Sequence, residues 1–258
     1  MNLRISKKTY ILPFIVLTSL FSLKVSSIGK KSTGVIAPAA AALATVSAAE
    51  MLYGQLALDS LGLSREAFQY ALQGHENLQK AGKLANEDIL SIVDFSLPST
   101  KKRLFVIDLA SGQLLFNTLV SHGRNSGREM ATNFSNAPES FKSSLGFYIT
   151  GSTYRGAHGY SLRLEGEEQG INDNAMERGI VMHAADYVNE KLGRVQGYIG
   201  RSLGCPAVPV SLHKKIIGKI RNGSCLFIYS PNQQYLSASR MIQLPAQKQY
   251  LSGSGNEA

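Results

Sequence analysis

The stretch Gly200-Arg201-Ser202-Leu203-Gly204-Cys205-Pro206-Ala207 follows a β-rich run, Gly179-Ile180-Val181-Met182-His183, in the second half of the chain. The two stretches supply a thiol and an imidazole, which can serve as nucleophile and base in acyl transfer. Small residues beside Cys205 let a substrate carbonyl and two backbone N–H groups approach the sulfur closely. The pair therefore predicts a cysteine-dependent site on a loop of a β-rich domain.

Short β-rich segments separated by Gly and Asn turns dominate the sequence around this pair. A hairpin is predicted for residues 103–108 and 114–120, and further strands for 146–150, 160–164, 179–182 and 226–229. One late helix is predicted at 210–221, because Pro209 precedes it and Asn222-Gly223 follow it. The expected fold class is α+β, a β-rich catalytic domain with mixed sheets and one late helix, preceded by a short helical segment.

Residues 50–97 carry a helical pattern instead. Ser64 is a predicted N-cap with Glu66 in the first turn of its helix. Asn86 is the predicted cap of a further helix, which Pro98 ends. We interpret this segment as a helical packing element of the next domain, because it holds no polar cluster suited to chemistry.

The N-terminus has the layout of a secretory signal. Basic residues precede an apolar stretch from Tyr10 to Leu23, and small residues follow it. We therefore expect an exported protein of the periplasm or cell envelope, which contacts a membrane only if an uncleaved N-terminal anchor is retained. The predicted parts are a signal peptide or signal anchor (1–29), an Ala/Ser/Gly-rich tether (30–49), the helical segment (50–97), the catalytic domain (98–232) and a C-terminal tail (233–258).

The net charge of the chain is +9, which by itself would suggest a nucleic-acid partner. Residues 1–31 hold six of the basic residues and no acidic one, so the rest of the chain carries only +3. This is an ordinary globular surface, and no nucleic-acid binding is expected. A mild positive charge suits an anionic cell-wall polymer.

The chain has two cysteines, Cys205 and Cys225. In an oxidising compartment two cysteines commonly pair, so a disulfide-stapled structural domain is one hypothesis. Cys225 lies in an apolar run, 224–229, that is typical of a buried strand, where a free cysteine packs as a small hydrophobic residue. The sequence therefore favours a free Cys205 over a disulfide.

Several ordered blocks of the chain resemble one family of enzymes. The signature of L,D-transpeptidases, the YkuD-type enzymes that remodel bacterial peptidoglycan, is similar to the pattern formed by His183, Ser202, Gly204 and Cys205. A longer part of the chain, roughly residues 90 to 230, resembles the murein L,D-transpeptidase catalytic domain family. The matching blocks are 93–96, 102–109, 121–127, 134–136, 143–148, 158–162 and 200–207.

The resemblance implies a peptidoglycan stem tetrapeptide as substrate. Cys205 would attack the carbonyl of the L-centre of its third residue, expel the terminal D-Ala and form a thioester, with His183 as the base. An amine acceptor would give 3-3 cross-links, whereas water would make the enzyme an L,D-carboxypeptidase, and the sequence leaves both open. A catalytically silent peptidoglycan-binding module is the rival hypothesis. No cofactor and no metal is implied, and carbapenems are the expected inhibitors.

Other residues are candidates for support of the site. The backbone N–H groups of Gly204 and Cys205 are expected to form an oxyanion hole, and Ser202 to brace the turn or orient the imidazole. Arg201 is a candidate to bind a substrate carboxylate. The remaining substrate-binding candidates are His158, Tyr160 and Tyr154; His158 and also His122 lie in Gly-flanked loops of the kind that bind substrates.

The resemblance also indicates where this site is unusual. Leu203 stands where the signature has a second His, and Ala207 stands where an Arg or Asn is usual. Polar support for the sulfur must therefore come from other residues. Asp186 is a candidate to orient the imidazole, although in the wider family a backbone carbonyl commonly does so.

Overall fold

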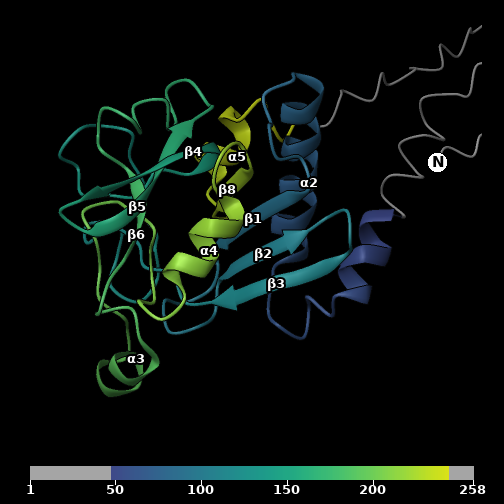
Figure 1. The fold of residues 1–258 in the computed structure, drawn as a ribbon. Helices are drawn as coiled ribbons and strands as arrows, with labels where there is room; N and C mark the ends of the chain where they lie inside the picture. The colour runs from purple at the N-terminus through teal and green to yellow at the C-terminus, as the bar shows by residue number, and fades with distance from the viewer. Residues whose placement is uncertain (1–47, 244–258) are drawn as a thin grey trace, which may run out of the picture. The chain divides into compact units, whose positions relative to one another are not determined.

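The computed structural model describes residues 48–243, so the predicted signal segment, nearly all of the predicted tether and residues 244–258 of the predicted tail lie outside the described residues. One eight-stranded sheet organises the described part, in the order β3-β2-β1-β8-β4-β5-β6-β7 (Figure 1). The β1/β8 and β6/β7 pairs are parallel and the other pairs antiparallel. The predicted α+β class with a mixed, β-rich sheet is confirmed.

The strands follow each other along the chain with few helices between them. They are β1 (Ile89–Asp94), β2 (Leu104–Asp108), β3 (Gln113–Thr118), β4 (Gly146–Gly156), β5 (Gly159–Gly166), β6 (Val181–Ala184), β7 (Ala207–Val208) and β8 (Cys225–Tyr229). The helices are α2 (Arg65–Lys80), α3 (Glu190–Gln196), α4 (His213–Ile220) and α5 (Gln233–Ala238). None of the helices within residues 48–243 has the length and apolar character needed to span a bilayer.

The predicted β-hairpin of residues 103–120 is confirmed as β2 and β3, which pair around a turn in which Gly112 has φ +60°. The other predicted strands correspond to β4, β5, β6 and β8. The strand β4 continues to Gly156, well beyond the predicted range, because it forms a long antiparallel hairpin with β5. This hairpin extends toward the site described below.

The helix predicted from Asn86 is wrong, because Ile89–Asp94 forms β1. β1 lies between β2 and β8, and every one of its residues is buried. A strand covered on both faces has a continuous apolar run rather than an alternating one, and such a short run also satisfies helical spacing. The sheet therefore takes a central strand from the segment that is predicted to be a separate helical part.

The N-cap prediction at Ser64 is confirmed. Its hydroxyl accepts a hydrogen bond from the Ala67 backbone N–H at 3.3 Å, at the start of α2. The backbone N–H of Ser64 donates to Asp94 Oδ2 at 2.8 Å, so the cap also ties α2 to the end of β1. Gly74 lets α2 approach the sheet, since a Cβ at this position would lie 2.0 Å from Phe147 Cζ.

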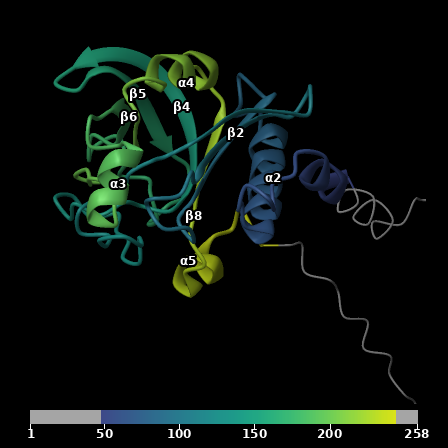
Figure 2. The same cartoon turned by 90° about the horizontal axis from the view of Figure 1, so that it is seen from below.

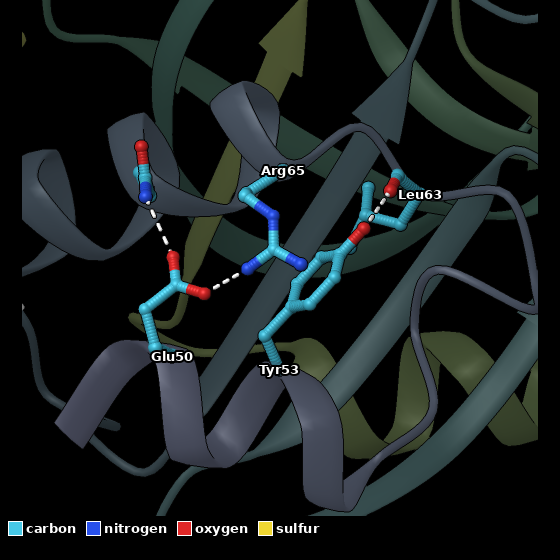
Figure 3. Close-up of polar contacts among 5 residues, drawn as sticks. Glu50, Tyr53, Leu63 and Arg65 are labelled. Atoms are coloured by element: carbon cyan, nitrogen blue, oxygen red, sulfur yellow. Dashed lines mark hydrogen bonds and ion pairs between the residues drawn. The ribbon is translucent and has the colours of Figure 1, made fainter. Parts of the chain in front are cut away.

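A helical segment at residues 48–55 packs beside the start of α2. Figure 3 shows the Tyr53 hydroxyl donating to the Leu63 carbonyl, at 2.5 Å, while Arg65 pairs with Glu50. The Arg65 guanidinium lies 4.4 Å above the centre of the Tyr53 ring. These contacts hold the segment on the fold, as the helical pattern of the sequence predicts.

The helices cover both faces of the central strands. α2 lies on one side and α4 on the other (Figure 2), which explains why β1 is buried throughout. The predicted late helix is confirmed as α4, although it begins at His213 rather than at residue 210. The short helices α3 and α5 were not predicted, and α5 lies within the predicted tail, where Tyr235 is buried.

Candidate active site

Cys205 lies in the turn before β7, and its sulfur faces the start of β6. The Val181 backbone N–H donates to Cys205 Sγ at 3.5 Å, and Sγ lies 3.7 Å from the Gly179 carbonyl oxygen. A thiol held by both a donor and an acceptor has a fixed direction. The turn thus presents the sulfur at the edge where β6 and β7 pair.

Both cysteines are free thiols, which does not support the disulfide hypothesis. Cys225 is in β8, fully buried between β1 and β4. Burial raises the pKa of the Cys225 thiol beyond the physiological range. Cys225 therefore packs as a hydrophobic residue and is chemically inert.

His183 lies in β6, directly paired with Ala207 of β7. The strand β7 begins two residues after Cys205, so the pairing places His183 beside the end of the turn that carries the thiol. His183 is only 2% exposed. The sequence predicted these two residues as nucleophile and base, and the parallel β6/β7 pairing brings the two segments that carry them, far apart in sequence, side by side.

A backbone carbonyl orients the imidazole of His183. Its Nδ1 lies 2.9 Å from the Ala184 carbonyl oxygen, so Nδ1 carries the proton and donates it, leaving Nε2 as the base. Asp186 is exposed and does not make this contact. Of the two groups considered from the sequence, the backbone carbonyl is therefore the one that orients the imidazole.

Burial sets the protonation states of the pair in the resting site. It lowers the pKa of His183, and the charge of His158 lowers it further, while the Ala184 carbonyl opposes both. Burial raises the pKa of the Cys205 thiol, against the Val181 and Cys205 backbone N–H groups and the charge of Arg178. At neutral pH the pair is therefore a neutral thiol and a neutral imidazole, so the proton must move during the attack.

Ser202 braces the turn that carries the nucleophile. Its hydroxyl donates to the Cys205 carbonyl oxygen at 2.6 Å and accepts from the Gly204 backbone N–H at 3.0 Å. Of the two functions considered for Ser202, the structure thus shows the bracing contacts. Because the Gly204 N–H already has this partner, its part in an oxyanion hole remains a prediction.

Gly204 meets a steric requirement at this turn. Its φ is +129°, a conformation that residues with a side chain rarely adopt. A Cβ here would also lie 2.9 Å from the Lys142 carbonyl oxygen and 3.0 Å from Ile180 Cδ1. The glycine therefore allows the turn to pack closely over the segment that contains Lys142.

Arg201 contacts the neighbouring loop in this structure. Its Nη1 donates to the carbonyl oxygens of Arg124 and Gly127, both at 3.0 Å, and its guanidinium lies 5.5 Å from the Tyr198 ring centre. These contacts fix the loop next to Ser202. Binding of a substrate carboxylate by Arg201 remains a prediction.

His158 covers the catalytic imidazole. The two rings stack with centroids 4.2 Å apart and an interplanar angle of 19°. His158 is exposed, and it lies in the turn between β4 and β5, whose long hairpin is visible in Figure 1. This loop histidine, a candidate from the sequence, therefore contacts His183, and its binding of substrate remains a prediction.

The two tyrosine candidates lie on opposite faces of the sheet. Register pairs Leu162 with Met182, so Tyr160, two residues before Leu162, lies on the face opposite His183. Tyr160 packs near His213 of α4, with ring centroids 6.4 Å apart. The prediction that Tyr160 binds substrate is therefore not supported, because alternation along β5 turns its ring away from the sulfur.

Tyr154 lies on the same face of the sheet as His183. It pairs with Ser161 on the hairpin, and the Arg163 guanidinium lies 4.6 Å from its ring centre. Arg163 pairs with Val181, which shares the face of His183. Tyr154 therefore remains a candidate for contact with substrate.

His122, the other loop histidine, is part of a buried structural network. Arg103, fully buried, donates from Nη2 to His122 Nδ1 at 2.7 Å, and His122 Nε2 donates to the Gly127 carbonyl oxygen at 3.2 Å. Burial and the charge of Arg103 lower the pKa of His122 to about 3. His122 thus stays neutral and supports the turn, since its carbonyl accepts the Ser202 backbone N–H at 3.0 Å.

Sequence reasoning missed two residues near the sulfur. Arg178 precedes β6, and its charge acts on the Cys205 thiol. Burial is the main cause that raises the pKa of Tyr187, and the Cys205 thiol adds to the shift. A lone Arg in a polar loop and a Tyr after a strand give no sequence signal that separates them from surface residues. Residues 48–243 contain no cluster of His, Cys, Asp or Glu that could hold a metal ion.

The turn before β7 carries a free thiol and the neighbouring strand β6 carries a carbonyl-oriented imidazole, the two groups that cysteine acyl transfer requires. The family model described as "L,D-transpeptidase catalytic domain" matches residues 59–229, and the chain belongs to this family. The match begins well before residue 98, in agreement with the place of β1 inside the sheet. No curated protein matches the chain.

Solved structures of L,D-transpeptidases are also similar to the chain. An L,D-transpeptidase from Mycobacterium smegmatis is 14% identical over 55% of this chain and 59% of its own, with TM-score 0.36. L,D-transpeptidase 1 from Mycobacterium tuberculosis is 12% identical over 55% and 62%, with TM-score 0.33. The helical cell shape determining protein Pgp2 from Campylobacter jejuni, as its K307A mutant, is 15% identical over 64% and 57%, with TM-score 0.37. The chain thus spans less than two thirds of the length of each of these structures.

Proposed function

We propose that this protein is a peptidoglycan-remodelling L,D-transpeptidase that transfers acyl groups from stem tetrapeptides through a thioester at Cys205. The observation that carries the proposal is the pairing of His183 with Ala207, two residues after Cys205, together with a free thiol and an imidazole held by the Ala184 carbonyl. Family membership makes peptidoglycan the substrate class, since the family acts on the cell wall outside the cytoplasm. Export through residues 1–29 belongs to the same proposal.

The first half-reaction forms the thioester. His183 Nε2 takes the thiol proton as Cys205 Sγ attacks the carbonyl carbon of the L-centre at the third stem residue. The backbone N–H of Cys205, beside the sulfur, donates to the oxyanion that develops. The C–N bond then breaks, and the protonated His183 gives its proton to the departing D-Ala amine. A thioester and free D-Ala result, with His183 neutral again.

The second half-reaction releases the acyl group. The side-chain amine of a neighbouring stem attacks the thioester carbonyl and loses a proton to His183. The C–S bond breaks, Cys205 regains a proton, and a 3-3 cross-link is formed. Water in place of the amine would give the L,D-carboxypeptidase reaction, with a trimmed tripeptide as product.

A carbapenem tests the first half-reaction, because its β-lactam carbonyl resembles the donor peptide. Incubation of the full chain should give a covalent adduct in intact mass that Cys205→Ala abolishes. Cys225→Ala is the matched control, and it should retain the adduct. Absence of an adduct together with retained binding to isolated peptidoglycan would support a silent wall-binding module. With the disaccharide tetrapeptide as substrate, a cross-linked dimer indicates transpeptidation and a trimmed tripeptide indicates hydrolysis.

A further inference from the structure

Arg178 binds one segment of the chain with both ends of its guanidinium. Nη1 donates to the Ser135 carbonyl at 2.8 Å and to Ser144 Oγ at 3.1 Å. Nη2 donates to the Lys142 carbonyl at 2.6 Å and to Ser140 Oγ at 3.3 Å. The fork therefore fixes residues 135–144, a segment without regular structure over most of its length.

The fixed segment lies directly under the turn that carries the nucleophile. Ser143 Oγ donates to the Gly204 carbonyl oxygen at 3.2 Å. A Cβ on Gly204 would lie 2.9 Å from the Lys142 carbonyl oxygen and 3.4 Å from Arg178 Nη2. Arg178 is therefore adjacent to Gly204, the residue before Cys205. It also fixes the segment that packs beneath Gly204.

The charge of Arg178 is not matched by a carboxylate. All four of its hydrogen-bond acceptors are neutral carbonyl or hydroxyl oxygens. None of the ion pairs within residues 48–243 includes Arg178. A half-buried cation with neutral partners can interact strongly with an anion that forms nearby.

The other titratable groups around the sulfur do not supply a fixed positive charge. His183 contributes from β6 a ring whose pKa is lowered by burial, and His158 lies above it from the β4–β5 hairpin. Tyr187, after β6, and Tyr148, behind Arg178, are phenols whose pKa values are raised by burial. Arg178, in the loop before β6 and adjacent to Gly204, is thus the cation whose charge acts on the thiol.

We propose that Arg178 is a positioning residue for the nucleophile, which fixes residues 135–144 beneath the Gly204-Cys205 turn and stabilises the Cys205 thiolate with its charge. The inference rests on the proposed use of Cys205 as the nucleophile. It also provides the polar support that Leu203 and Ala207 do not, because the guanidinium replaces side chains missing from the turn itself. As a thiolate develops during the attack, the nearby guanidinium lowers its energy.

Two kinds of substitution separate the two functions of Arg178. Arg178→Lys keeps the charge and loses the fork, whereas Arg178→Met loses both. The pH dependence of iodoacetamide alkylation at Cys205, measured by peptide mass, reports the thiol pKa without requiring any transfer activity. We expect Arg178→Met to move the alkylation midpoint to higher pH, with the rate at neutral pH falling about tenfold for each unit of the shift. Arg178→Lys should keep the wild-type midpoint and acylate more slowly with a carbapenem.

Ser144→Ala is the matched control, since it removes one partner of Arg178 and leaves the charge; its midpoint should equal that of the wild type. If Arg178→Met does not fold, Arg178→Gln replaces it, because its amide can still donate to the Lys142 carbonyl. If a folded variant without the charge, Arg178→Met or Arg178→Gln, keeps the wild-type alkylation midpoint, Arg178 does not stabilise the thiolate. This holds even if the melting temperature and the acylation rate fall. Wild-type acylation by Arg178→Lys overturns the positioning part. Failure of the proposed function is distinct, because the wild type would then form no carbapenem adduct while its alkylation still titrates.

Discussion

The imidazole of His158 stacks on that of His183, with ring centroids 4.2 Å apart and planes inclined by 19°. One ring is exposed at the end of a hairpin and the other is buried in the sheet edge. The charge of His158 disfavours protonation of His183, so the stack helps to keep the base neutral. The end of the β4–β5 hairpin therefore covers His183 and also lowers the pKa of its imidazole.

His158→Phe tests this coupling, because Phe keeps a ring for stacking and removes the charge. The pKa of His183 should rise, and the acid limb of the carbapenem acylation profile should move to higher pH. Stopped-flow acylation rates across the acidic range measure this midpoint. His158→Gln, which loses the ring, is the comparison for stacking. An acid limb at the wild-type position or lower in His158→Phe would contradict the coupling.

The pH profile of the wild-type protein follows from the lowered pKa of His183. The neutral imidazole is the active base, so the rate falls as the pH drops through this pKa. The midpoint should therefore lie below the ordinary value of 6.5 for histidine. Acylation rates from pH 4 to pH 8 would show it, provided circular dichroism confirms folding at each point. A rate that remains constant throughout this range would remove His183 from the function of base.

Ser202→Ala should slow acylation more than it destabilises the fold. The hydroxyl connects the Gly204 N–H with the Cys205 carbonyl, so its loss loosens the turn around the sulfur. We expect acylation at least about tenfold slower, equivalent to about 1.4 kcal/mol of activation free energy. Ser202→Thr keeps the hydroxyl and serves as the control. Equal rates for Ser202→Ala and wild type would mean that other contacts fix the turn.

The sequence singles out Cys205 and His183 because the proposed chemistry requires specific residue types. A cysteine between glycine and proline, and a histidine at the end of an apolar strand, are visible without knowing how the strands pair. The position of β1 was not predictable in the same way. Its run of buried residues satisfies both helical and strand spacing, and only its pairing with β2 and β8 decides between them.

Long-range register explains the remaining differences. Tyr154 and Tyr160 look equivalent in sequence, yet the pairing of β5 with β6 places them on opposite faces. Arg178 gives no local signal, because its importance depends on residues 135–144 and on Gly204, which are distant in sequence. Such residues become evident only when the loops that they connect are placed in space.

Glu168 provides a test of fold stability away from the active site. Its carboxylate accepts hydrogen bonds from the Phe147 backbone N–H at 2.8 Å, from the Tyr235 hydroxyl at 3.1 Å and from the Ser239 hydroxyl. It thereby ties β4 to α5 and the residue that follows α5. Burial raises its pKa even though these three donors oppose the shift.

The raised pKa determines how stability depends on pH. The folded protein binds the Glu168 proton more tightly than the unfolded chain does, so this contribution is present below the unfolded pKa, near 4.5. It is lost as the pH rises through the higher folded pKa. Glu168→Gln carries no titrating group at this position. Its free energy of unfolding should therefore increase relative to that of the wild type as the pH rises across this window. Urea unfolding at several pH values measures the difference, with Glu167→Gln, at the neighbouring carboxylate that pairs with Lys83, as the control. A difference between wild type and Glu168→Gln that is constant with pH would show that the carboxylate has the same pKa in the folded and unfolded states.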